Sequence, residues 1–336
     1  MVRAELIYAC VAQLDLAAQQ LQSPEPSYGR LALVLTDNVV ELTLHRQCEE
    51  HFWLRGFLDP LLSTEEVKTR DRVLGKRFDE KPKFCCLLDM ISELERDFIL
   101  AAHRYRSEAY HLGVLHEDIV HALAWEYHAL ACQLFGRFPP RGVTVRFDDR
   151  PTQAVRRHFG EKGIDFVTNA SRAFQEAAAS LSQARPALDE ELPVVLSGSA
   201  VRRIRKVQDD LAFLTTSNSD ALDEGGIIER LQFYKHVFGE HVGIAGLTDI
   251  KEPPDLAAKL QEVRAAWRPK IRANPCPKWQ ERALALARET SPTVALRKFE
   301  SLQSQTAEFV DIVSEAAASL SYGIELAGDL RRDMGL

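Results

Sequence analysis

The sequence predicts an all-α protein with an N-terminal four-helix bundle and a C-terminal helical domain. Apolar residues recur at helical spacing over most of the chain, and helix-breaking residues interrupt this pattern at intervals. The chain has 336 residues, and a typical domain has on the order of 100–200, so two domains are expected. Glycines and prolines that follow residue 137 mark the boundary, which gives domains 1–137 and 138–336.

The first domain is expected to contain four main helices. They cover approximately residues 4–21, 29–57, 82–111 and 117–134. Pro24 follows the first helix, because proline has no amide hydrogen to continue the helical hydrogen bonds. Ser63 and Glu66 have the spacing of a capping box and predict an additional short helix. Gly113 is expected to cap the third main helix at its C-terminal end.

The second domain also shows helical periodicity. Residues 143–147 alternate in polarity and predict either a short strand or a connector. Six helices are then expected near residues 152–184, 189–216, 226–239, 255–268, 278–288 and 292–330. Ser291 and Pro292 form a typical helix start before the last one. The apolar stripe of this last helix is expected to face either the bundle or a second copy of the chain.

The overall charge argues against a protein that coats nucleic acid without specificity. The formal net charge is −7, whereas non-specific binding depends on many contacts from Lys and Arg to phosphates. An enzyme with one local basic patch remains compatible with this composition.

The cysteines and the N-terminal segment predict a cytoplasmic protein. Six cysteines occur without CxxC spacing, which indicates reduced thiols and no zinc site. Glu5 and Asp15 interrupt the first apolar stretch and argue against a signal peptide. No apolar run reaches the ~18–20 residues of a membrane span, so no membrane association is expected.

The most informative segment lies at the end of the third main helix. It reads RSEAYHLG over residues 106–113, and residues 37–42 upstream read DNVVEL. The two stretches together resemble the signature of HEPN (higher eukaryote and prokaryote nucleotide-binding) domains. The resemblance covers residues 1–137 and implies a HEPN-like four-helix bundle.

The resemblance implies an active site built from Arg106 and His111. In this family the two residue types form a metal-independent ribonuclease, often across a dimer interface. Arg106 would then hold the phosphate, and His111 would act as general base or acid. Ser107 occupies the polar position after the arginine, where the family more often has Asn, Asp or His.

These residue types suit RNA cleavage without a metal ion. Histidine titrates near neutral pH and can donate or accept a proton. Arginine is always charged and matches the geometry of phosphate. Arg106 and His111 point about 140° apart on an ideal helix, so local unwinding or a partner subunit is needed to bring them together.

Further residues are expected to support this site. Seven positions separate Arg104 from His111 and place both on one face, so Arg104 is a second phosphate-contact candidate. Other supporting candidates are Ser107, Glu108, Tyr110, Asp37 and Glu41. Asp37, Glu41 and His45 lie at helical spacing and either orient the Arg–His motif or form a hydrated stripe.

A basic cluster in the second domain is a candidate RNA contact. It consists of Arg202, Arg203, Arg205 and Lys206. The cluster either follows an RNA backbone or is a solvated helix face balanced by nearby acidic residues.

The favoured function is a metal-independent endoribonuclease of a toxin or antiviral defence system. The expected partners are an RNA substrate, a second copy in a homodimer, and an antitoxin or regulatory protein. No metal and no cofactor are expected. The alternative is a catalytically silent HEPN module that binds RNA or a protein, and a helical scaffold without nucleic acid is a third possibility.

Overall fold

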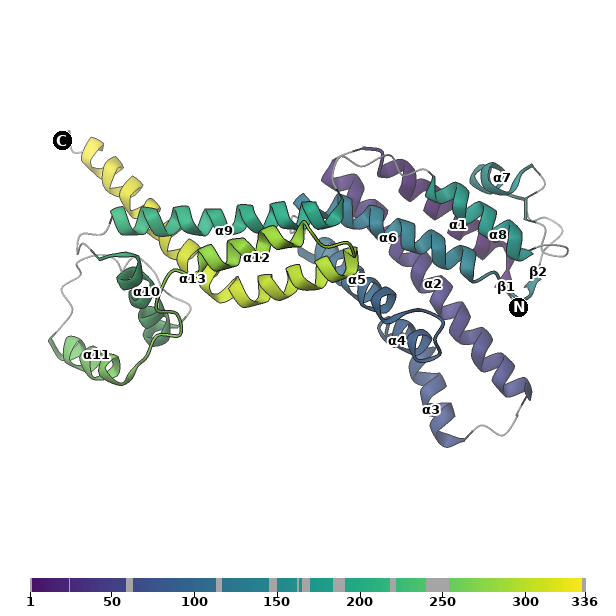
Figure 1. Ribbon diagram of the computed structural model, residues 1–336, viewed down its shortest axis with the longest axis horizontal. Coiled ribbons are helices and arrows are strands. Elements are labelled where there is room, and N and C mark those ends of the chain that lie inside the picture. Colours follow the sequence, from purple (N-terminus) through teal and green to yellow (C-terminus); the bar gives the residue numbers. More distant parts are fainter. Residues whose placement is uncertain are drawn as a thin grey trace. The chain divides into compact units, whose positions relative to one another are not determined.

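The protein is all-α, as predicted (Figure 1). The computed structural model describes residues 2–23, 25–58, 63–112, 117–144, 150–161, 163–164, 170–183, 191–217, 222–239 and 254–333. None of the helices in these residues combines the length and apolar character that crossing a membrane requires. The chain divides into two compact units. Unit 1 comprises residues 1–195 and 290–296, and unit 2 comprises residues 196–289 and 297–336.

Three long helices form the centre of unit 1. They are α1 (Ala4–Gln20), α2 (Pro26–Leu58) and α6 (Glu117–Arg137). Helix α2 lies against both α1 and α6. It approaches α6 closely at Gly29, where an added Cβ would stand 3.2 Å from the Cα atom of His121. The core between them is apolar and includes Leu33, Leu44 and Trp125, all fully buried.

The short helix predicted after Ser63 is present as α3 (Thr64–Val73). The capping box is confirmed, because Ser63 Oγ accepts a hydrogen bond from the Glu66 amide. In return the Glu66 carboxylate accepts one from the Ser63 amide at 2.8 Å.

The prediction of one helix over residues 82–111 is wrong, because the structure has two helices there. They are α4 (Glu80–Leu87) and α5 (Glu93–Leu112). Asp89 interrupts the helix with a left-handed φ of 54°. Ser92 then starts α5 with a second capping box, in which its amide donates to Glu95 Oε2 at 2.7 Å and its Oγ accepts from the Glu95 amide at 3.2 Å.

The prediction of one helix over residues 152–184 is also wrong. The structure has α7 (Gln153–Phe159) and α8 (Ala170–Ser182) instead. Gly160 and Gly163 follow α7 with φ values of 84° and 74°, a conformation that ends a helix and that glycine adopts without strain.

Helices α7 and α8 belong to unit 1. Helix α7 packs on α1, and α8 packs on α6. The second contact is so close that a Cβ on Gly136 would stand 2.7 Å from the Ala178 side chain. The boundary predicted after residue 137 therefore falls inside unit 1.

The only strands among the described residues are two-residue segments. β1 (Val2–Arg3) pairs in parallel with β2 (Val143–Thr144). The second lies at the start of residues 143–147, for which the sequence predicted either a short strand or a connector; residues 145–147 lie outside the described residues.

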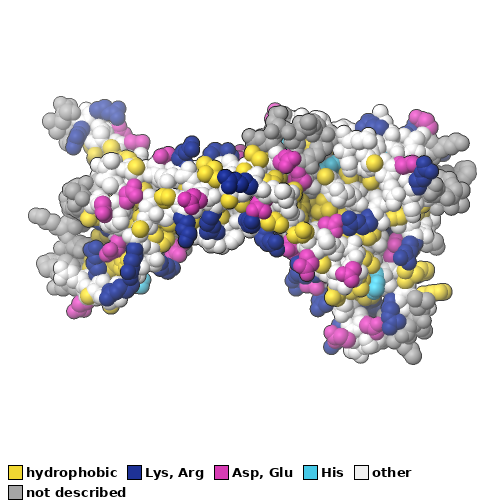
Figure 2. Space-filling model, viewed as in Figure 1, with side chains coloured by type: hydrophobic (Ala, Val, Ile, Leu, Met, Phe, Trp, Pro, Cys, Tyr) yellow, Lys and Arg dark blue, Asp and Glu magenta, His cyan; other side chains and the backbone are white. Residues whose placement is uncertain are grey.

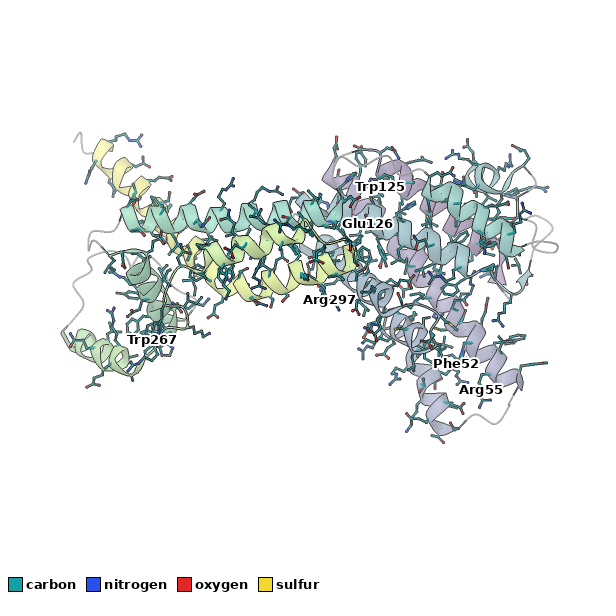
Figure 3. All side chains as sticks on the ribbon, in the orientation of Figure 1. Phe52, Arg55, Trp125, Glu126, Trp267 and Arg297 are labelled. Carbon is teal, nitrogen blue, oxygen red and sulfur yellow. The ribbon has the colours of Figure 1, made fainter. Side chains whose placement is uncertain are left out.

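The five helices predicted from residue 189 onward are present. They are α9 (Leu192–Thr216), α10 (Glu224–Phe238), α11 (Pro254–Ala266), α12 (Cys276–Leu286) and α13 (Pro292–Asp333). In unit 2, Ser314 of α13 donates to Asp210 of α9 at 2.9 Å. Trp267, labelled in Figure 3, packs edge-on against Phe233 of α10.

Candidate active site in unit 1

Asp37 is the centre of the candidate site. It lies on α2, and its side chain is only 2% exposed. An isolated buried carboxylate is costly, so a buried one is expected to have donors or cations around it. Three side chains from two other helices supply them: His103 and Arg106 from α5, and Tyr127 from α6. These four residues are called the Asp37 cluster below.

Arg106 was predicted from the sequence and lies beside Asp37. Its Nε atom is 3.5 Å from Asp37 Oδ2, and its side chain is 33% exposed. The guanidinium group is therefore close to a buried negative charge while part of the side chain still reaches solvent. Asp37 is buried and lies beside Arg106, so it is not part of a hydrated stripe; its role in orienting the arginine stays a prediction.

His103 has the closest contact with Asp37. Its Nδ1 atom lies 2.9 Å from Oδ2 and 3.2 Å from Oδ1. The ring of Phe78 stacks on the imidazole with the centroids 3.9 Å apart and an angle of 11° between the planes. The carboxylate and the aromatic ring together restrict both the position and the plane of the histidine.

Tyr127 is the buried hydrogen-bond donor of the cluster. It is fully buried on α6, directly after Trp125 and Glu126, which Figure 3 labels. Its hydroxyl donates to Asp37 Oδ1 at 2.9 Å. Burial raises the pKa of Tyr127 well above the ordinary value of a tyrosine, and the negative charge of Asp37 raises it further. The phenol therefore stays protonated and keeps donating to the carboxylate.

Glu41 lies one turn after Asp37 on α2 and contacts a different cation. Its Oε1 atom is 3.8 Å from Nζ of Lys81 on α4. The lysine side chain is only 3% exposed, and Nζ also donates to the carbonyl groups of Gly75 and Arg77 at 2.9 and 3.2 Å. Lys81 thus fixes the turn before α4 and brings a buried positive charge near Glu41.

Of the remaining predicted site residues, the structure describes the side chains of some and only the backbone of others. Arg104 is exposed on α5, whereas Ser107 and Glu108 are half-buried. The backbones of Tyr110 and His111 belong to the last turn of α5. Their side chains lie outside the described residues, as does the predicted cap Gly113. His45, grouped with Asp37 and Glu41 by spacing, instead lies 3.5 Å from Glu49.

The basic cluster on α9 belongs to unit 2, whereas the Asp37 cluster lies wholly in unit 1. Lys206 is paired with Asp210 at 2.8 Å. Arg202 and Arg205 are exposed, and Arg203 is half-buried. On α9 the basic block is followed by Asp209 and Asp210. Figure 2 shows both basic and acidic side chains on the surface that the structure describes.

Sequence reasoning did not select His103, Phe78, Lys81 or Tyr127 as site residues. His103 could have been recognised, because it precedes Arg106 by three positions and so shares its helix face. No sequence spacing links Phe78 or Lys81 to the motif. Both lie near His103 or Glu41 because of how the turn between α3 and α4 folds.

The arrangement provides groups for acid–base and phosphate chemistry. It combines an imidazole bound to a carboxylate, a neighbouring guanidinium group and partial access to solvent. Among the described residues, no group of three or more His, Cys, Asp or Glu side chains is placed to hold a metal ion. Comparisons with models of known protein families, with curated proteins and with solved structures found no match for this chain.

Proposed function

We propose that unit 1 is a HEPN-type, metal-independent endoribonuclease, with Arg106 as the phosphate-binding residue and His111 as a proton-transfer residue. The observation that carries the proposal is the position of Arg106, 3.5 Å from the buried carboxylate of Asp37 and one third exposed. The RSEAYHLG and DNVVEL stretches, on which the resemblance rests, supply both of these residues.

The chemistry of RNA cleavage explains why this position matters. When the 2′-oxygen attacks the phosphorus, negative charge accumulates on the phosphorane oxygens. A guanidinium group fixed before the reaction stabilises this charge without having to reorganise. The contact with Asp37 restricts the rotation of the Arg106 side chain, and the exposed part of that side chain allows contact with a substrate.

The biological setting of the proposal comes from the resemblance. It implies a toxin or antiviral defence system and a homodimer that an antitoxin or regulatory protein controls. The proposed cytoplasmic location rests instead on the cysteine pattern and on the charged residues in the first apolar stretch. A two-fold dimer would bring a second Arg106 and a second His111 to the site. Arg202, Arg203, Arg205 and Lys206 are proposed to contact RNA outside the reacting phosphate.

The proposal is tested with full-length protein and total cellular RNA in the presence of EDTA. We expect the parent protein to cleave RNA and expect Arg106→Ala and His111→Ala to lose at least about 100-fold in rate. Arg172→Ala is the matched control, because Arg172 is an exposed arginine that pairs with Glu176 on α8. It should cleave like the parent.

Two other outcomes would replace the proposal. If the parent protein binds RNA in a salt-dependent manner but does not cleave it, unit 1 is a catalytically silent binding module. If it neither binds nor cleaves RNA, the protein is a helical scaffold that acts without nucleic acid.

A further inference from the structure

The hydrogen bonding of His103 determines which of its nitrogens is available for chemistry. Nδ1 faces both oxygens of the Asp37 carboxylate, at 2.9 and 3.2 Å. A carboxylate only accepts hydrogen bonds, so Nδ1 carries the hydrogen. In the neutral ring, Nε2 then has a free lone pair, as required of a general base.

Nε2 of His103 has no hydrogen-bond partner among the residues that the structure describes. The side chain is 27% exposed, although Asp37 beneath it is almost fully buried. The basic nitrogen can therefore contact a substrate, whereas the carboxylate that orients it cannot.

The surroundings hold the ring in one orientation. Phe78 covers one face of the imidazole, with the planes only 11° apart. The hydroxyl of Tyr127 donates to Oδ1 of Asp37 at 2.9 Å and so holds the carboxylate that contacts the ring. The charged or titratable groups near the ring are Asp37 on α2, Arg106 on α5 and Tyr127 on α6, with Lys81 and Glu41 beyond them.

Arg106 follows His103 by three positions on α5, so both side chains leave the same face of the helix. Both contact Oδ2 of Asp37. A phosphate bound by the guanidinium group of Arg106 would therefore lie next to the imidazole of His103.

We infer that His103 is the general base of the ribonuclease reaction and that Asp37 is its positioning residue; this inference rests on the proposed function. Nε2 of His103 takes the proton of the 2′-hydroxyl while the 2′-oxygen forms a bond to phosphorus. The bond from phosphorus to the 5′-oxygen breaks, and the leaving 5′-oxygen takes a proton from His111. The products are a 2′,3′-cyclic phosphate and a 5′-hydroxyl end.

The competing explanation is that the Asp37–His103 contact only ties α2 to α5. His103→Asn separates the two roles, because its amide nitrogen can still donate to Asp37 but cannot accept a proton at neutral pH. We expect this variant to keep the thermal stability of the parent. We expect its cleavage rate to fall by about 100-fold or more, and its pH–rate profile to lose one ionisation.

Two more variants test whether the effect is specific to the imidazole of His103. His103→Ala leaves a gap under Phe78, and added imidazole should restore part of its activity, which a purely structural role does not predict. His121→Asn is the matched control, because His121 contacts a backbone carbonyl, that of Leu21, at 3.0 Å. Its cleavage rate per folded molecule should equal that of the parent.

The outcomes distinguish this inference from the proposed function. If the parent cleaves RNA, Arg106→Ala does not, and folded His103→Asn cleaves with the rate and pH profile of the parent, the base is another group and the proposed function stands. If the parent does not cleave RNA at all, the proposed function fails and the role of His103 fails with it.

Discussion

The carboxylate of Asp37 on α2 and the imidazole of His103 on α5 lie 2.9 Å apart, although 66 positions of sequence separate the two residues. The same carboxylate also accepts the hydroxyl hydrogen of Tyr127 from α6. One buried charge therefore joins three helices and orients the two basic side chains to which we assign chemistry. The candidate site and the stability of unit 1 depend on the same residue.

Tyr127→Phe should destabilise the protein by about 2 kcal/mol, because Asp37 would lose a hydrogen bond to a buried charged group. The free energy of unfolding, measured in urea, tests this. Tyr322→Phe is the matched control, since Tyr322 is 62% exposed on α13 and should change stability by less than about 0.5 kcal/mol. Equal stability of the two variants would show that the phenol contributes nothing to holding Asp37.

Glu95 makes the stability of unit 1 depend on pH. Burial alone would raise the pKa of Glu95, but hydrogen bonds from Arg137 and Ser92 outweigh burial and hold this pKa below the ordinary value of a glutamate. A lowered pKa in the folded state stabilises the protein above the unfolded pKa, and this stability is lost as pH falls through the folded pKa.

Glu95→Gln should consequently be less stable than the parent at about pH 7, and the difference should shrink as the pH falls below about 4.5. Thermal unfolding across this range measures it. A difference that stays constant over the whole range would contradict the role assigned to the charge of Glu95.

The buried thiols should resist alkylation in the folded protein. Burial raises the pKa of Cys10 and Cys276 to about 11 and that of Cys132 to about 12. Cys48 lies 3.7 Å from Cys85, and this contact, together with burial, raises its pKa further. Thiolates are the reactive species, so iodoacetamide at about pH 8 should label only the half-buried Cys86 quickly.

Mass spectrometry of the labelled peptides measures how fast each cysteine reacts. In urea, all six cysteines should react at similar rates. Rapid labelling of Cys10 or Cys132 in buffer without urea would contradict the packing of α1 and α6.

Asp15 should hold α7 against α1. Its carboxylate accepts hydrogen bonds from Arg157 and His158, each at 2.8 Å, and His158 also contacts Ser180 of α8 at 2.9 Å. Asp15→Asn weakens both contacts, so trypsin should cleave after Arg157 faster than in the parent. Asp71→Asn is the control, because Asp71 is exposed and pairs with its neighbour Arg70. Equal cleavage in both variants would contradict this role of Asp15.

Helix positions were predictable from the sequence to within a few residues, but two helix breaks were not. The helical spacing of apolar residues continues across residues 88–92: Phe84, Ile91 and Phe98 follow one another at intervals of seven positions, and all three are buried. The break depends on Asp89 and on the capping box of Ser92 and Glu95. The serine–glutamate spacing is visible in the sequence, whereas the left-handed conformation of Asp89 is not.

The candidate site was predictable only where its residues belong to the motif. Arg106 and Asp37 were both selected, and the structure places them together. His103 was overlooked because its partner lies 66 positions away on another helix. The stacking of Phe78 depends on how the turn before α4 folds, which periodicity does not determine.

The most direct test of metal-independent cleavage is the chemistry of the RNA ends produced in EDTA. Attack by the 2′-oxygen predicts fragments with 2′,3′-cyclic phosphate and 5′-hydroxyl ends, and a 2′-deoxy nucleotide at the cleavage site should block the reaction. Fragments with 5′-phosphate ends, cleavage only after a divalent metal is added, or intact RNA would each contradict the account.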